Sequence, residues 1–163
     1  MPREHADIKM TPEELREFLQ SDNRLVVATL DGDGSGWADA AAYAFFDDRV
    51  YFRLPVDTRS YRNIQRDRRV CCVVESKPAT ASYYDIKGAM LHGAADAVAR
   101  QAVPVEVSAA LDAVPDPVTP DEPRDGQVFS IGLDDHTSFM FAKIKYRYED
   151  RALKSIQADA GLV

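Results

Sequence analysis

Short apolar runs separated by turn residues form the main pattern of this chain. Four runs have the length and composition of β-strands, and they cover residues 24–30, 37–46, 49–54 and 69–75. The segment Asp31-Gly32-Asp33-Gly34-Ser35-Gly36 predicts a turn after the first run, because glycine and aspartate supply the backbone angles that a hairpin requires. Asp47-Asp48 predicts a tight turn after the second run. The first three runs therefore predict a meander of antiparallel strands.

Three segments carry the signals of short helices. Thr11-Pro12-Glu13-Glu14 is a capping box with proline at the first helical position, and it predicts a helix to about Gln20. Asp57-Thr58 is a candidate N-cap for a second helix over residues 58–66. Residues 105–114 could form a third helix.

The second half of the chain predicts further strands. A long extended stretch covers residues 82–98, and Gly88 and Gly93 within it predict bulges or a bend of a barrel. Residues 127–133 and 138–148 predict the last two strands, with a turn at Asp134-Asp135-His136. Six to seven antiparallel strands with a few short helices favour a mainly β fold, a closed or split barrel.

The length suggests one domain over residues 1–163, with enough chain to bury a sizeable core. Residues 112–126 hold four prolines and five acids, so we expect an exposed excursion there. The tail over residues 150–163 is expected to be mobile.

Composition narrows the classes of function. A formal net charge of −7 argues against a general nucleic-acid binder, because such binding depends on neutralising phosphates. No apolar run approaches the roughly 20 residues that a membrane span needs, and the polar N-terminus does not have the pattern of a secretory signal. The adjacent Cys71 and Cys72 would point to opposite faces of a strand and stay unpaired, as in a reducing cytoplasm. No Cys/His metal pattern is present, so we expect no metal site.

One short segment concentrates positive charge in this acidic protein. Residues 53–69 hold six of the fourteen arginines and only two acids. Arginine suits phosphate because its planar fork donates two parallel hydrogen bonds, and a helix N-terminus adds N–H groups and a favourable dipole. The segment predicts an anion site; the alternative is a solvated basic face of a helix.

Four phrases, in this order, resemble one family: VVATLDGDG, DDRVYFR, TRSYRNIQRDRRV and KGAMLHGAADAV. The chain is similar, over roughly residues 11–100, to the pyridoxamine 5'-phosphate oxidase-like split-barrel flavoproteins. The resemblance implies a homodimer of split barrels with FMN, or the deazaflavin coenzyme F-420, lying between the two chains.

The resemblance also implies a phosphate-binding phrase at the start of the second helix. Here that phrase is Thr58-Arg59-Ser60, in which Arg59 matches the family's arginine and Thr58 offers a hydroxyl in place of the usual serine. Ser60 stands where lysine is common, so one phosphate cation is missing. Arg62 lies one turn further and either compensates or faces solvent.

Two further places are implied to contact the ring of the cofactor. The strand that ends at Phe52-Arg53-Leu54 borders the isoalloxazine ring in the family, and its backbone groups would hold the ring. Lys87 matches a basic position near the flavin N1–C2 edge, where a fixed cation would stabilise the reduced anion. The alternative for Lys87 is a solvated lysine on the rim of the barrel.

We therefore predict a cytoplasmic oxidoreductase that transfers a hydride between FMN or a deazaflavin and an unidentified small molecule. The chain ends at residues 159–163 without the Arg/His-bearing substrate segment of true pyridoxamine 5'-phosphate oxidases, so that activity is not expected. Catalytic residues cannot be named from the sequence. The alternative is a non-catalytic flavin- or haem-binding module on the same fold; His92 could face a haem or lie on the barrel surface.

Overall fold

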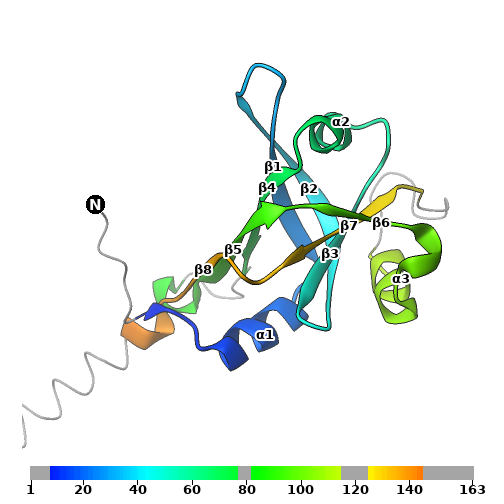
Figure 1. Cartoon of the computed structure of the whole chain (residues 1–163). Helices are drawn as coiled ribbons and strands as arrows, with labels where there is room; N and C mark the ends of the chain where they lie inside the picture. Colours follow the sequence, from blue (N-terminus) through cyan, green and yellow to red (C-terminus); the bar gives the residue numbers. More distant parts are fainter. Residues whose placement is uncertain (1–7, 77–81, 115–124, 145–163) are drawn as a thin grey trace, which may run out of the picture.

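The computed structural model describes residues 8–76, 82–114 and 125–144. Its main element is a single antiparallel sheet that curls into a split barrel (Figure 1). The eight strands are β1 (Arg24–Leu30), β2 (Gly36–Phe46), β3 (Arg49–Leu54), β4 (Arg69–Glu75), β5 (Lys87–Ala94), β6 (Asp96–Val98), β7 (Gln127–Gly132) and β8 (His136–Met140). Their order across the sheet is β6-β7-β3-β2-β1-β4-β5-β8. The mainly β split barrel is thus confirmed, with one strand more than the six or seven predicted.

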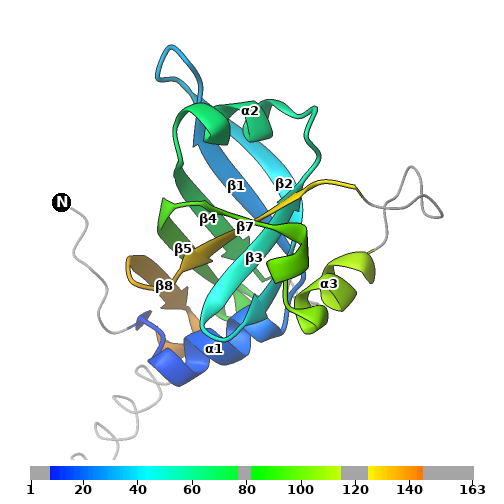
Figure 2. The ribbon, with the colours of Figure 1, turned by 45° about the vertical axis from the view of Figure 1, so that its right-hand side comes forward.

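Three α-helices surround the barrel. Helix α1 (Pro12–Gln20) lies at one end, α2 (Arg59–Arg66) lies at the other end, and α3 (Val105–Asp112) packs beside β2 and β3 (Figure 2). Single turns of 3-10 helix cover Tyr83–Asp85 and Arg100–Ala102. None of the helices in the described part of the chain is long and apolar enough to cross a membrane.

Local sequence signals explain where α1 and the second hairpin begin. The Thr11 hydroxyl accepts a hydrogen bond from the Glu14 N–H at 3.2 Å, and the Glu14 carboxylate accepts one from the Thr11 N–H at 3.2 Å. This is the predicted capping box. Asp47 and Asp48 have φ angles of 49° and 56° and join β2 to β3. Such a two-residue turn matches the twist of the strands that it joins.

The barrel is split because β2 belongs to both of its halves. The first part of β2, residues 36–42, pairs with β1, and residues 43–46 pair with β3. On the first side the sheet continues through β4, β5 and β8, and on the second side through β7 and β6.

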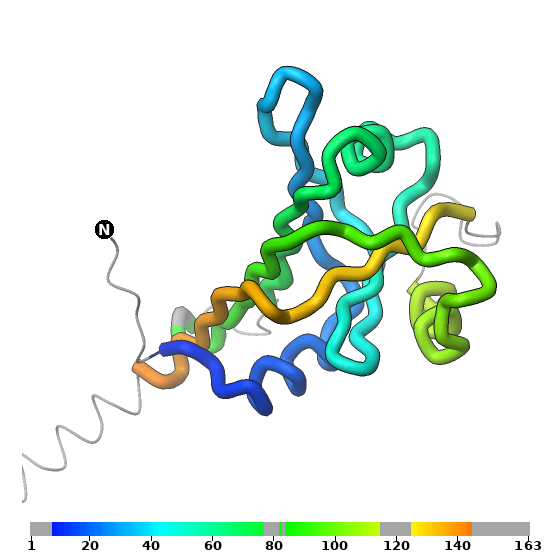
Figure 3. Tube along the Cα trace, in the orientation of Figure 1, coloured from blue at the N-terminus to red at the C-terminus, as the bar shows by residue number. Residues whose placement is uncertain are grey.

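The long extended stretch near residue 90 is two strands separated by a bend. Strand β5 ends at Ala94 against β4, and β6 begins at Asp96 against β7, so the chain crosses from one half of the barrel to the other (Figure 3). The bend follows Gly93, as predicted, but none occurs at Gly88. A Cβ at Gly88 would lie only 2.6 Å from the Phe139 ring, so the lack of a side chain at this position leaves space for that ring.

The core fills the space inside the barrel. Apolar side chains alternate inward along the strands, so that Val27, Phe52 and Leu91 are fully buried. Helix α1 adds Leu15, Phe18 and Leu19, and α2 adds Ile64; all belong to the same cluster. A smaller cluster joins α3 to the outside of β2 through Val107, Leu111 and Ala44.

The C-terminal part differs from the sequence-based prediction. We predicted a strand over residues 138–148, but β8 covers His136–Met140 and residues 142–144 are helical. His136 is therefore the first residue of a strand, where its Nδ1 lies 2.7 Å from the Leu133 carbonyl oxygen, and not part of a turn. The core of the predicted excursion, residues 115–124, and the predicted tail, residues 150–163, lie outside the described residues.

Candidate anion-binding site beside helix α2

A cavity of about 470 Å³ lies between helix α2 and the loop that joins β1 to β2. Its lining is polar, with three arginines from the helix and two aspartates from the loop. The lining residues are Asp31, Gly32, Asp33, Arg59, Arg62, Asn63 and Arg66. Arg59, Arg62, Asn63 and Arg66 share one face of α2, because residues three and four apart in a helix are neighbours. The concentration of arginine noted in the sequence thus lines a cavity.

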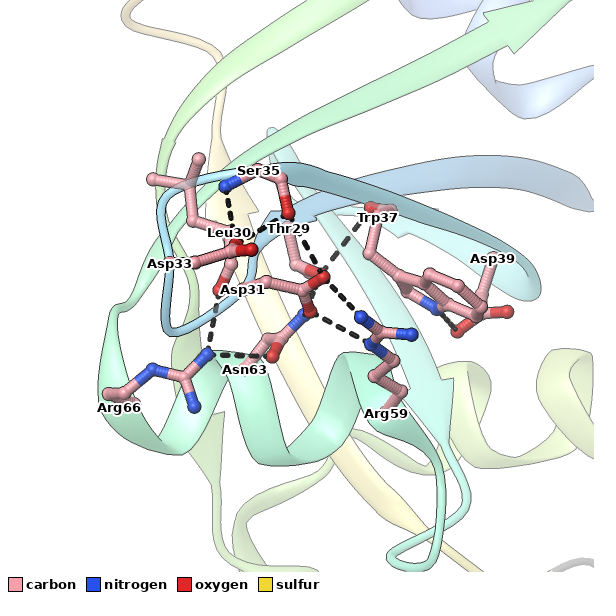
Figure 4. A network of polar contacts seen from close by, with 10 residues as sticks. All are labelled: Thr29, Leu30, Asp31, Asp33, Ser35, Trp37, Asp39, Arg59, Asn63 and Arg66. Atoms are coloured by element: carbon pink, nitrogen blue, oxygen red, sulfur yellow. Dashed lines mark hydrogen bonds and ion pairs between the residues drawn. The ribbon is translucent and has the colours of Figure 1, made fainter.

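The closest contact in the cavity is an ion pair between Arg59 and Asp31. Arg59 Nε donates to Asp31 Oδ1 at 2.9 Å, and Arg59 Nη2 donates to Asp31 Oδ2 at 2.5 Å (Figure 4). The Arg59 guanidinium also lies 4.2 Å from the centroid of the Trp37 ring. The hydrogen bonds from Arg59 and Asn63 hold the pKa of the Asp31 carboxyl below its usual value. Two of the three guanidinium nitrogens of Arg59 are therefore committed to Asp31.

Asn63 joins the helix to the loop from below the cavity. Its side chain is buried, and Nδ2 donates to Thr29 Oγ1 at 3.0 Å and to Asp31 Oδ1 at 2.8 Å. Its Oδ1 accepts a hydrogen bond from Arg66 Nη2 at 2.8 Å, and the same nitrogen donates to the Leu30 carbonyl at 3.0 Å. The positions of Asp31 and Arg66 are thus set by one buried amide (Figure 4).

Ser60 does not line this cavity. Its side chain is fully buried, and its hydroxyl donates to Asp39 Oδ2 on strand β2. The same carboxylate oxygen accepts a hydrogen bond from Trp37 Nε1 at 2.9 Å. Ser60 is therefore part of the contact between α2 and the sheet.

Thr58 and Arg62 lie at the start of the same helix. Thr58 is the predicted N-cap: its hydroxyl accepts from the Tyr61 N–H at 3.3 Å and donates to the Pro55 carbonyl at 2.7 Å. Arg62 is exposed, lines the cavity, and donates from Nη1 to the Asp57 carbonyl at 2.9 Å. Of the predicted phosphate residues, the structure brings Arg59 and Arg62 to the cavity, and Thr58 holds the helix that carries them.

The three predicted residues at the end of β3 lie elsewhere. Phe52 is fully buried and stacks on Phe129 with the ring centroids 5.6 Å apart, and Leu54 is also in the core. Arg53 donates from Nη1 to Asp112 Oδ1 at 2.8 Å, which ties β3 to α3. Its buried Nη2 has no partner among the described residues. A role in holding a ring would therefore fall to backbone groups or to Arg53.

Lys87 lies at the opposite end of the barrel from Arg59. Its Nζ is 5.6 Å from the centroid of the Phe18 ring of α1. Its backbone N–H donates to the Ser76 hydroxyl, and its carbonyl accepts from the Ser76 N–H, just beyond the end of β4. The pairing of β5 with β4, and of β4 with β1, places Lys87 at the end of the sheet where β1 begins. Asp31, which binds Arg59, follows the last residue of β1 at the other end. The seven residues of β1 span about 20 Å at roughly 3.3 Å per residue. Within one chain, Lys87 and Arg59 do not share a site.

Comparison with known proteins identifies the family. The model of the pyridoxamine 5'-phosphate oxidase family matches residues 11–133. The chain belongs to this family. The match covers strands β1 to β7 and the cavity beside α2. No protein of curated function matches the sequence closely.

Solved structures share the fold at low sequence identity. A conserved hypothetical protein from Mycobacterium tuberculosis is 20% identical with a TM-score of 0.67, over 88% of this chain and 92% of that one. A FAD-binding protein from Mesorhizobium loti is 13% identical with a TM-score of 0.61, over 80% and 93%. A FAD- and haem-binding protein from Mycobacterium smegmatis is 14% identical with a TM-score of 0.60, over 80% and 71%. Proteins that share this fold thus include two that are described as binding FAD.

Five residues of the cavity were missed by reading the sequence: Asp31, Gly32, Asp33, Asn63 and Arg66. Asp31 was interpreted only as a turn residue, and its pairing with Arg59 spans 28 positions of the chain. Asn63 and Arg66 could have been found from helical spacing, since they lie four and seven residues after Arg59.

Proposed function

We propose that this protein binds the phosphate of a flavin or deazaflavin in the cavity beside α2 and transfers a hydride between the bound ring and a small molecule. The observation that carries the proposal is an arginine-lined cavity within the segment that matches the family, on a fold shared with proteins described as binding FAD. The ring supplies the redox chemistry when it is bound, and the protein supplies binding, orientation and electrostatics.

The residues of the cavity fit a phosphate group. Arg59 keeps its Nη1 group available, because its hydrogen bonds to Asp31 use Nε and Nη2. A guanidinium held on one side by a carboxylate presents its remaining N–H groups in a fixed direction. Asp31 would then fix the direction of Arg59, although its own negative charge opposes the binding of a phosphate. Among the described residues, no apolar side chain lines the cavity, so the ring would lie outside it.

The cavity is suited to anchoring rather than to proton transfer. Its two carboxyls, Asp31 and Asp33, both have a pKa below the usual value, Asp31 through Arg59 and Asp33 through hydrogen bonds from Ser35. Both are therefore ionised at neutral pH, where a general acid would need a proton to give. We expect any proton donor for the substrate to come from outside this cavity.

A second copy of the chain is the partner that we propose. One row of directly paired residues runs across β2, β1, β4 and β5, and its members share one face of the sheet. This is the outward face, away from the core. That row is Ala40, Val26, Val73 and Met90. Val26 and Met90 are 43% and 37% exposed although both are apolar. A homodimer that covers this row would bring a second chain against this sheet, and the ring of the cofactor would then lie between the two chains.

A non-catalytic module that carries flavin or haem is the second candidate. It is favoured by a solved neighbour described as binding both FAD and haem. His92 lies exposed on β5, on the outward face of the sheet.

One set of measurements tests the proposal. The small molecule that co-purifies with the protein is identified by mass spectrometry, and the apoprotein is titrated with FMN, FAD, F-420 and haemin. We expect a yellow protein, or saturable binding of a flavin or deazaflavin that Arg59→Ala weakens. Substrate-dependent bleaching of the bound ring supports hydride transfer. A Soret band with no flavin affinity would favour the haem module and reject our proposal.

A further inference from the structure

Four of the six arginines between residues 53 and 69 are neutralised by a nearby acid. Arg53 pairs with Asp112, Arg59 with Asp31, Arg68 with Asp96, and Arg69 with Asp67. Arg62 and Arg66 form no ion pair within the described residues. Arg62 donates only to the Asp57 carbonyl, and Arg66 donates only to the Leu30 carbonyl and the Asn63 amide oxygen. Each of these hydrogen-bond partners is neutral, so neither guanidinium is bonded to a carboxylate in the described part of the chain.

Both of these arginines line the cavity beside α2. They are four residues apart in one helix, which places their side chains on the same face about 6 Å apart at Cβ. Arg59, one turn before Arg62, lines the same cavity and is already paired with Asp31. The cavity therefore holds one arginine that a carboxylate has oriented and two that no described carboxylate binds.

Gly32 leaves room for the second of these arginines. A Cβ at Gly32 would lie 3.5 Å from Arg66 Cζ and 3.6 Å from Arg66 Nη1. A side chain longer than methyl at position 32 would thus meet the guanidinium and fill part of the cavity. Gly36, at the far end of the same loop, has no neighbour within 4 Å of such a Cβ. Glycine at position 32 keeps the face of Arg66 open toward the cavity.

From this we infer that Arg62 and Arg66, with Gly32, form a second anion subsite next to Arg59. The ligand that fits has two adjacent anionic groups, as the pyrophosphate of FAD or the phosphodiester and carboxylates of F-420 do. FMN, with a single phosphate monoester, would satisfy only one subsite. The inference rests on the proposed function, because it assigns the tail chemistry of the same cofactor.

The subsite is tested with inorganic anions and with cofactors. Thermal shifts are measured with phosphate and pyrophosphate, and dissociation constants with FMN, FAD and F-420. We expect pyrophosphate to raise the melting temperature more than phosphate does. We also expect FAD or F-420 to bind about tenfold or more tightly than FMN, since one added charged hydrogen-bonded contact is worth about that. Whether FAD or F-420 gains more identifies the source of the second anion.

Matched variants separate the subsite from the fold. Arg62→Ala and Arg66→Ala are expected to remove the preference for pyrophosphate and for the longer cofactor. Gly32→Asp keeps both arginines and should also remove the preference for pyrophosphate, because the new carboxylate would pair with Arg66. This variant shows whether the loss in Arg66→Ala comes from the missing charge or from a change in the structure of the loop. Gly36→Asp, with the same change of charge, and Arg100→Ala, at a side chain that is 91% exposed, should keep the preference.

The outcomes distinguish the two proposals. A preference for pyrophosphate that depends on Arg62 and Arg66, without affinity for any flavin or deazaflavin, keeps the subsite and rejects the proposed function. Binding of FMN that is as tight as that of FAD and F-420, with no preference for pyrophosphate, keeps the proposed function and overturns the subsite. Equal losses for FMN, FAD and F-420 in both variants would also overturn it, because all three arginines would then hold a single phosphate.

Discussion

Arg59 and Asp31 join helix α2 to the β1–β2 loop through two hydrogen bonds, of 2.9 and 2.5 Å. The arginine is 48% exposed at its side chain, whereas the aspartate is only 10% exposed. The acid therefore lies below the arginine and holds it at the surface of the cavity. The pair sets the direction of the guanidinium and also places a negative charge beside any bound anion.

Asp31→Asn is expected to tighten the binding of FMN about three- to tenfold at low salt, because it removes a carboxylate that competes for Arg59 and repels the phosphate. The gain should shrink as salt rises, since exposed charges are screened within about 8 Å at physiological ionic strength. Titration of the apoprotein by flavin fluorescence measures it. Asp33→Asn separates the two effects, because it also removes a negative charge from the cavity but breaks no hydrogen bond to Arg59. Weaker binding in Asp31→Asn would mean that orientation of Arg59 outweighs repulsion.

Arg59→Ala is expected to weaken the binding of FMN about 10- to 150-fold, as the loss of a charged, two-bond contact does. Arg59→Lys should recover only part of the loss, because a lysine lacks the planar fork. Isothermal titration at fixed salt measures both. Arg100→Ala is a better control than Arg68→Ala, since Arg68 is bound to Asp96 and to the Ala95 carbonyl. Equal, small effects at Arg59 and Arg100 would restore the interpretation of a solvated basic helix.

Ser60→Ala is expected to lower the free energy of unfolding by about 1 kcal/mol, because the buried hydroxyl donates to Asp39, and to leave FMN affinity unchanged. Ser60→Lys should cost more stability, since a lysine does not fit a fully buried position without displacing its neighbours. Urea unfolding measures both effects. A Ser60→Lys protein of normal stability that binds FMN more tightly would show that position 60 belongs to the phosphate site after all.

Val26→Asp is expected to convert the proposed dimer into a monomer, because it places a charge in the outward apolar row of the sheet. Because Val26 is 43% exposed in the single chain, the substitution should lower the stability of the monomer only slightly. Light scattering at micromolar concentration measures the mass. Val105→Asp, at an 81% exposed position that begins α3, is the matched control and should keep the dimer. If Val26→Asp and the wild type have the same mass, this face is not the interface.

The protein is expected to lose stability in acid below about pH 4. The hydrogen bonds from Arg69 lower the pKa of Asp67 from 3.8 to about 2, and Arg59 and Arg16 lower those of Asp31 and Asp48. A carboxyl whose pKa is lower in the folded state stabilises the fold above its unfolded pKa, and this contribution is lost as the pH falls through the folded value. Melting temperatures between pH 7 and pH 2 measure it. The melting temperature of Asp67→Asn should fall less steeply than that of the wild type between pH 4 and pH 2. If both proteins show the same fall, Asp67 does not contribute to the loss of stability in acid.

Strands and caps followed from the sequence because their signals are local. The boundaries of β1, β3 and β4 agree with the apolar runs, and the Thr11 and Thr58 caps agree with the side chains that accept the first helical N–H groups. The last strand was predicted too long, because apolar and aromatic residues continue past Met140 although pairing with β5 ends there. Register with a partner strand, not composition, ends β8.

The sequence by itself determined the fold class, the family and the segment that carries the arginines, since these depend on short patterns and their order. Only the tertiary structure decided which arginines are free to bind an anion. Arg59 and Arg53 are paired with acids 28 and 59 positions away, and such partners cannot be read from a local pattern. Ser60, predicted to touch phosphate, is buried against Asp39, because the helix turns that position toward the sheet. Helical spacing predicts that Arg59, Arg62 and Arg66 lie on one face of α2. The packing of α2 against β1 and β2 decides that this face, and not the one that carries Ser60, lines the cavity.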